Sequence, residues 1–193
     1  MEHGSMTNIC IEDNENYSEE FCRYSLFKVA KGLNAMHNKN VLHRDIKSDN
    51  ILYDGEGEIK ITDLGFTCFL SEQAKWRQTK KGTPNWISPE IAAGISYSKE
   101  IDVWSFGCFA YELATGNPPF ANIRNRRQLV YNIINVDVPV ITGNWSDEFK
   151  DFVKCCLKRN PRERMEMRQL LFEHPFLAGI DENKSLIAWK KDV

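Results

Sequence analysis

A polar run from His43 to Asn50, HRDIKSDN, carries the side chains of this chain that could do chemistry, and a second acid, Asp63, follows it. Asp45 can orient the proton of an attacking hydroxyl, and Lys47, on the same side of an extended loop, can contact a phosphate as a point charge. Asn50 and Asp63 offer the hard oxygen atoms that Mg²⁺ prefers. These groups suit phosphoryl transfer from a metal-bound nucleotide, in which the protein mainly positions groups and neutralises charge.

For any one of these residues alone, a polar loop with a capping acid and a solvated lysine is the more common explanation. The set is different, because several polar identities and their spacing must coincide. The run and the second acid together therefore predict an active site.

The elements that must position this loop are mostly helical. Ser18 followed by two glutamates predicts a helix start, and apolar residues at helical spacing continue that helix to about His37. Two short strands, near 50–53 and 59–62, predict a hairpin whose open ends hold the amide and the second acid, close enough to share a metal ion. The fold class predicted is mainly α with a small β-hairpin.

Three later segments extend the helical body. The stretch 101–113 is apolar on nearly every side, which predicts a buried helix. A helix that starts at Ser146 carries its apolar residues on one face, and the last clear periodic segment ends near His174. The six cysteines lack C-x-x-C spacing and are expected to be buried free thiols.

Composition bounds the class of protein. A length of 193 residues suits one domain or one large lobe. The net charge of −2 gives no case for binding nucleic acid or an anionic membrane. No run of about 18 apolar residues predicts a membrane span, and no signal-peptide pattern opens the chain. The expected location is the cytoplasm, with the nucleus as a second option.

The ordered motifs resemble the C-terminal lobe of a eukaryotic protein kinase. The HRD run at 43–45, DLG at 63–65 and SPE at 88–90 stand where that family has H-R-D, D-F-G and A-P-E. Lys47 is typical of the Ser/Thr-specific branch. With GTPNW at 82–86, the chain is most similar to the sterile-twenty group, PAK-like members above all.

That resemblance implies a Ser/Thr protein kinase with ATP and Mg²⁺ as cofactors. Asp45 and Lys47 would be the catalytic residues. Lys47, Asn50 and Asp63 would bind the nucleotide, with Asn50 and Asp63 as the metal ligands. The partners implied are protein substrates with Ser or Thr acceptors and, upstream, a small GTPase or an activating kinase.

The resemblance also implies a switch. Thr79 stands where similar kinases are phosphorylated, and Arg44 is a natural partner for that phosphate. A solvated threonine is the alternative for Thr79. Thr83 matches the threonine that contacts the catalytic Asp and Lys and lines the substrate pocket.

Further residues match structural positions of the family. Glu90 is expected to pair with Arg164, and Asp102 to brace the backbone of the catalytic loop. Leu64 replaces the usual Phe and is expected to keep its packing role. Residues 1–177 would form a kinase C-lobe that begins near the hinge. Residues 178–193 would form a tail that docks on the lobe, inhibits it or binds a partner.

A kinase covers the nucleotide with a G-x-G-x-x-G loop and pairs a strand Lys with a helix Glu. Neither motif occurs in the sequence, so we expect the smaller lobe to be missing, an apolar face to be exposed and ATP not to bind the chain alone. Two functions stay open: a kinase whose parent chain includes that lobe, and a truncated, non-catalytic lobe that acts as a binding or regulatory module. The intact set of catalytic side chains favours the kinase.

Overall fold

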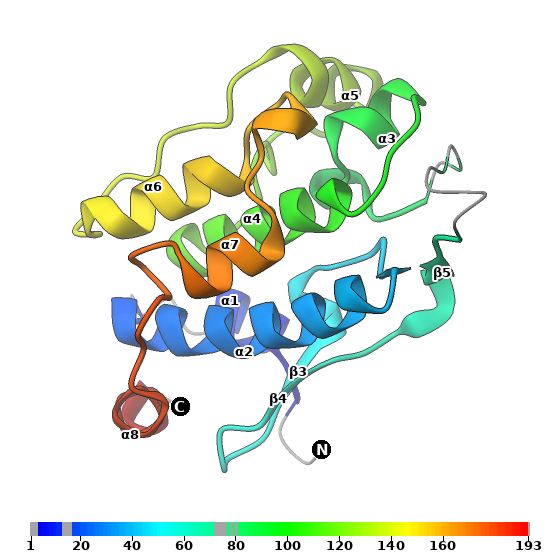
Figure 1. Ribbon diagram of the computed structural model, residues 1–193. Coiled ribbons are helices and arrows are strands. Elements are labelled where there is room, and N and C mark those ends of the chain that lie inside the picture. Colours follow the sequence, from blue (N-terminus) through cyan, green and yellow to red (C-terminus); the bar gives the residue numbers. More distant parts are fainter. Residues whose placement is uncertain (1–3, 13–16, 72–76, 78, 80, 193) are drawn as a thin grey trace.

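The computed structural model describes residues 4–12, 17–71, 77, 79 and 81–192. It is mainly helical with small sheets, which confirms the predicted fold class (Figure 1). The helices are α1 (Met6–Glu12), α2 (Glu19–Asn38), α3 (Pro89–Ala93), α4 (Glu100–Thr115), α5 (Arg126–Asn135), α6 (Asp147–Cys156), α7 (Met167–Phe172) and α8 (Glu182–Asp192). The strands are β1 (Gly4–Ser5), β2 (Val41–Leu42), β3 (Ile51–Tyr53), β4 (Ile59–Ile61) and β5 (Cys68–Phe69). Residues 1 and 193, the outer limits of the predicted lobe and tail, lie outside the described residues.

Helix α2 crosses the middle of the molecule, with α7 on one side and the hairpin on the other (Figure 1). It begins as predicted, because Ser18 Oγ accepts the Phe21 N–H at 3.1 Å and two glutamates occupy the first turn, where a helix favours acids. The apolar side chains of its inner face are fully buried, and they include Leu26, Val29 and Leu33. Burial of this stripe, more than intrinsic propensity, holds a helix of this kind in place.

Helix α4 is the buried helix that the sequence predicts. Its apolar residues contribute to the main core together with α2, α6 and α7. Gly107 permits the close approach of α6, because a Cβ there would lie 2.5 Å from the Cβ of Cys156. α6 also starts as predicted: Ser146 Oγ accepts the Phe149 N–H at 3.1 Å.

The predicted hairpin is present. Strands β3 and β4 pair antiparallel with Ile51 opposite Ile61, and β1 adds a third strand beside β3. A second ladder, which the sequence did not reveal, pairs β2 with β5 and puts Leu42 opposite Cys68. This ladder ties the chain before residues 43–50, the predicted catalytic run, to the chain after Asp63.

The five cysteines whose side chains are described are free thiols, as predicted. Three of them are buried, whereas Cys68 and Cys155 are only half-buried, which corrects the expectation that all are buried. Cys155 lies on a half-buried side of α6, whereas the side chain of its neighbour Cys156 is buried in the main core.

The tail beyond residue 177 contains helix α8, which the sequence analysis did not predict. α8 docks against α2 and the hairpin, seen end-on at the lower left of Figure 1. Trp189 is fully buried, its ring packs on Phe21, Tyr24 and Tyr53, and its Nε1 donates to Ser25 Oγ at 3.0 Å. Of the alternatives left open for the tail, the structure shows docking on the lobe.

Candidate active site

The backbone of the catalytic run is held by the buried carboxylate of Asp102 on α4. Its oxygens accept the N–H groups of His43 at 2.9 Å and Arg44 at 2.8 Å, and His37 Nε2 lies 2.9 Å from Oδ2. Burial alone would raise the pKa of Asp102, but the hydrogen bonds from His37 and from both backbone groups hold that pKa below its usual value. The predicted brace is confirmed, and Arg44 keeps a left-handed φ of 72° within it.

Both carboxylate oxygens of Asp45 are engaged, although the residue is 3 % exposed. Oδ1 accepts from Thr83 N at 2.9 Å and from Thr83 Oγ1 at 2.8 Å. Oδ2 accepts from Asn50 Nδ2 at 3.0 Å, and Lys47 Nζ lies 3.5 Å from it. Lys47 Nζ also donates to Thr83 Oγ1 at 2.9 Å. The structure therefore brings Asp45, Lys47, Asn50 and Thr83 together, and the predicted contacts of Thr83 are confirmed.

The side chains expected to hold a metal lie at the open end of the hairpin. Thr62 N donates to the Asn50 carbonyl at 2.8 Å, so Asp63, the next residue, leaves the sheet beside Asn50. The bonds of the Asn50 side chain use its amide nitrogen, which leaves the amide oxygen for a cation. Asp63 is exposed, and its Oδ1 accepts the Gly65 N–H at 3.2 Å. These are hard oxygen donors, so their chemistry fits Mg²⁺.

Arg44 links the catalytic run to the following segment. Its Nη1 donates to Thr79 Oγ1 at 2.9 Å, and its Nε donates to the Phe66 carbonyl at 2.5 Å. Tyr97 adds a third partner, since its hydroxyl donates to the Thr79 carbonyl at 2.8 Å and lies 3.0 Å from Thr79 Oγ1. The guanidinium therefore faces the Thr79 hydroxyl, the group at which phosphorylation is predicted.

Comparison with known proteins identifies the lobe. The family model described as "Protein kinase domain" matches residues 1–177. The chain belongs to the protein kinase family. It is 36 % identical to serine/threonine-protein kinase CLA4 of Candida albicans over 99 % of this chain and 20 % of that protein. It is 36 % identical to serine/threonine-protein kinase pakB of Dictyostelium discoideum over 95 % of this chain and 22 % of that protein. Against serine/threonine-protein kinase ste20 of Aspergillus fumigatus the identity is 38 %, over 92 % of this chain and 22 % of that protein.

These relatives confirm the resemblance to the sterile-twenty and PAK-like group. The kinase chain spans about one fifth of the length of each of them. In the part of the chain that the structure describes, no helix is both long and apolar enough to cross a membrane.

A second polar network of the kinase lobe was not predicted. Glu112 on α4 accepts from Ser48 Oγ at 2.7 Å and from Trp86 Nε1 at 3.1 Å, so it joins the catalytic run to the segment that follows Thr83. Burial raises the pKa of Glu112 to about 7. The sequence places an acid within the predicted buried helix, but it offers no signal for the distant partners Ser48 and Trp86.

Two other expectations have different outcomes. Glu90 and Arg164 form the predicted ion pair, with Arg164 Nη2 3.0 Å from Glu90 Oε1 and both side chains buried. Leu64, in contrast, is 60 % exposed, so the packing role expected from its apolar side chain is not seen within the described residues. Phe69 is 70 % exposed as well. The geometry also adds Tyr97 as a partner of Thr79, which no local pattern could indicate, because Tyr97 reaches it from a loop.

Proposed function

We propose that this chain is the catalytic and substrate-binding part of a Ser/Thr protein kinase that transfers the γ-phosphoryl of ATP to Ser or Thr hydroxyls of proteins. The observation that carries the proposal is the engagement of both Asp45 oxygens by Thr83 and Asn50, with the Lys47 ammonium within 3.5 Å. A carboxylate held in this way is pre-oriented, so little reorganisation is needed when a substrate hydroxyl arrives.

Each side chain has a chemical task in this proposal. Asp45 accepts a hydrogen bond from the substrate hydroxyl and directs its oxygen at the phosphorus. Lys47, already 2.9 Å from Thr83 Oγ1, neutralises charge on the transferred group. Asn50 and Asp63 would hold Mg²⁺, which when bound with ATP offsets the negative charge of the phosphates. Thr83 bonds to both Asp45 and Lys47 and would hold the two side chains in position.

The proposal extends to domain organisation and regulation. Residues 1–177 would be the kinase lobe, and 178–193 a tail that belongs to it structurally. Phosphate on Thr79 would pair with Arg44 through charge-assisted hydrogen bonds. The parent protein would act in cytoplasmic signalling, with protein substrates and with a small GTPase or an activating kinase upstream.

The test is phosphate transfer from radiolabelled ATP·Mg²⁺ to a mixed Ser/Thr protein substrate. Because no G-x-G-x-x-G loop occurs in the sequence, the assay joins the chain to a small lobe that carries one. Asp45→Asn should lower kcat by about 10²–10⁴-fold, the usual contribution of a positioned acid–base group. Asp147→Asn, at the exposed start of α6, should leave kcat unchanged. A joined protein that binds ATP but transfers no phosphate would favour the non-catalytic module instead.

A further inference from the structure

The segment 137–141 between α5 and α6 makes no backbone hydrogen bond to any of the described residues. It is part of the coil that leads from α5 to α6 along the upper left edge of Figure 1. Val136 has extended dihedrals, and Pro139 fixes its own φ and biases Val138 toward extended backbone. Within the described residues, the N–H groups of 137, 138, 140 and 141 donate no hydrogen bond and the carbonyls of 136–141 accept none. An extended segment with free donors and acceptors is a template for adding a strand.

This segment forms one wall of a groove of about 1040 Å³, and α6 with the turn after it forms the other. We call it the 136–141 groove. Its apolar lining consists of Val138, Pro139, Val140, Ile141, Val153 and Leu157. Val140 is 81 % exposed, although its neighbour Ile141 is buried in the main core. The groove thus presents apolar surface beside unpaired backbone.

The acids that line the groove already have partners. Asp137 pairs with Arg159 at 2.7 Å, and Glu163 accepts from Asn160 Nδ2 at 2.8 Å. Lys154, on α6, and Lys158, just after the end of α6, form no ion pair within the described residues. The charge left for a ligand is therefore positive.

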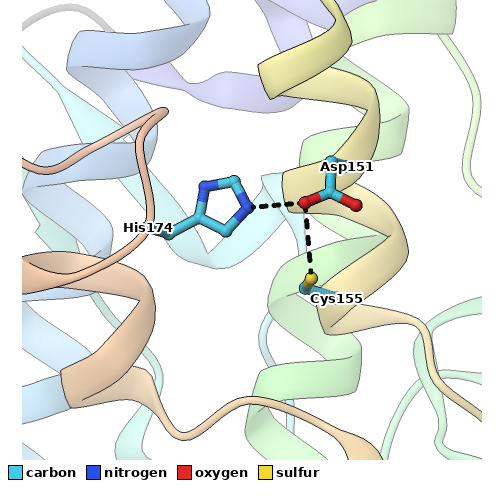
Figure 2. A group of neighbouring side chains, drawn as sticks. All are labelled: Asp151, Cys155 and His174. Carbon is cyan, nitrogen blue, oxygen red and sulfur yellow. Dashed lines mark hydrogen bonds and ion pairs between the residues drawn. The ribbon is translucent and has the colours of Figure 1, made fainter.

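Asp151, the remaining acid of the groove, points at His174 and Cys155 (Figure 2). The ligand atoms of these three side chains lie within 4.8 Å of one another, as in a metal site. The hydrogen bonds point elsewhere: His174 Nδ1 accepts the Phe176 N–H at 3.2 Å, so Nε2 carries the ring proton and donates to Asp151 at 3.3 Å. Metal binding through Nε2 needs the opposite tautomer, and burial raises the pKa of the Cys155 thiol. The three side chains hold α6 to the chain after α7, and Asp151 is satisfied.

We propose that the 136–141 groove binds an extended segment of a partner protein in which acidic and apolar residues alternate. Its backbone would pair with the free groups of 137–141. One face would place apolar side chains against Val153 and Leu157, and its acids would meet Lys154 and Lys158. Main-chain pairing supplies affinity and alternate side chains supply specificity in this mode of recognition. The surface is separate from the Asp45 site and does not depend on phosphoryl transfer.

The test measures binding of a fluorescein-labelled peptide that alternates glutamate with valine, by fluorescence anisotropy on the 193-residue chain. Lys154→Glu/Lys158→Glu should weaken binding roughly tenfold or more, because two attractions become repulsions. Lys39→Glu/Lys60→Glu changes the net charge equally at exposed positions outside the groove and should have no effect. The same peptide with lysine for glutamate, or with alternate amides methylated, should bind at least tenfold more weakly.

Specific results would overturn the proposal. Equal loss with both double variants would reduce the effect to non-specific charge. Equal binding of the methylated peptide would exclude strand addition. A dimer in sedimentation that Lys154→Glu/Lys158→Glu dissociates would assign the groove to a second copy of the chain. Unchanged circular dichroism of each variant serves as the folding control.

Discussion

Replacing Trp189 by alanine tests how firmly the tail helix α8 belongs to the kinase lobe. The indole is fully buried and packs at centroid distances of 5.7 Å from Phe21, 6.0 Å from Tyr24 and 5.9 Å from Tyr53. Its Nε1–H is the donor to the buried Ser25 hydroxyl. The substitution removes the stacking, opens a cavity and leaves Ser25 without that donor.

The size of the effect follows from these contacts. Truncating a buried aromatic side chain to alanine typically costs about 3–5 kcal/mol. Because α8 lies at the end of the described chain, it can detach, so the loss is limited to the free energy with which α8 docks. The salt bridges of Glu182 to Lys28 and Lys31 are partly exposed and contribute little to that docking. We expect a loss of about 3 kcal/mol in the free energy of unfolding.

The assay is urea denaturation followed by far-ultraviolet circular dichroism, since the substitution itself alters fluorescence. In a thermal scan the same loss corresponds to a fall of roughly 6–12 °C in Tm for a chain of this size. Ile187→Ala, two residues away and 61 % exposed, is the matched control and should change stability by less than about 0.5 kcal/mol. Equal stability of the two variants would refute the docking of α8.

Three further predictions concern the body of the kinase. Glu90→Ala should cost about 3–5 kcal/mol in urea denaturation, because Arg164 is left buried without its partner, whereas Glu173→Ala in an exposed pair should cost under about 1 kcal/mol; similar losses would contradict the buried pair. Burial raises the pKa of Glu112 from 4.5 to about 7 in the folded state, so the contribution of its protonation to the free energy of unfolding is fully present below pH 4.5 and lost as pH rises through 7. Glu112→Gln should remove about 3 kcal/mol of pH dependence from the free energy of unfolding over that window. An unaltered dependence of stability on pH in this variant would refute the prediction. Phosphate on Thr79 should raise activity in a form with both lobes, and equal activity of Thr79→Ala would defeat that expectation.

Much of the fold could be predicted because its determinants are local. Caps such as Ser18 and Ser146 lie next to the helices they start, and the apolar character of 101–113 follows directly from the chain. The hairpin likewise depends on residues that are close in sequence. Local patterns therefore gave helices α2, α4, α6 and α7 and the starts of α2 and α6, but not α3 or α5.

The candidate site needed the family resemblance as well. The bond from His43 N to Asp102 joins residues 59 positions apart, and that from Thr83 N to Asp45 spans 38. No periodicity encodes such contacts. Tyr97 and Glu112 show the same limit, since their partners are set by how distant segments pack.

Helix α8 was missed for a different reason. Its apolar residues Leu186, Ile187 and Trp189 do not form a continuous stripe, and Ile187 is exposed. One indole supplies most of the burial, so the signal lies in a single side chain and its aromatic neighbours. Pattern reading needs repetition, which this helix lacks.

The Asp102 carboxylate makes the loop around His43 and Arg44 as durable as the helix that carries it. A loop with its own exposed backbone bonds would open many times before the whole lobe unfolds. Here the amides are bonded to an acid inside the core, so exchange of their hydrogens with water requires the loop to separate from the buried Asp102 on α4. A loop that contains a left-handed residue, Arg44, is thereby expected to be among the slower parts of the lobe to open.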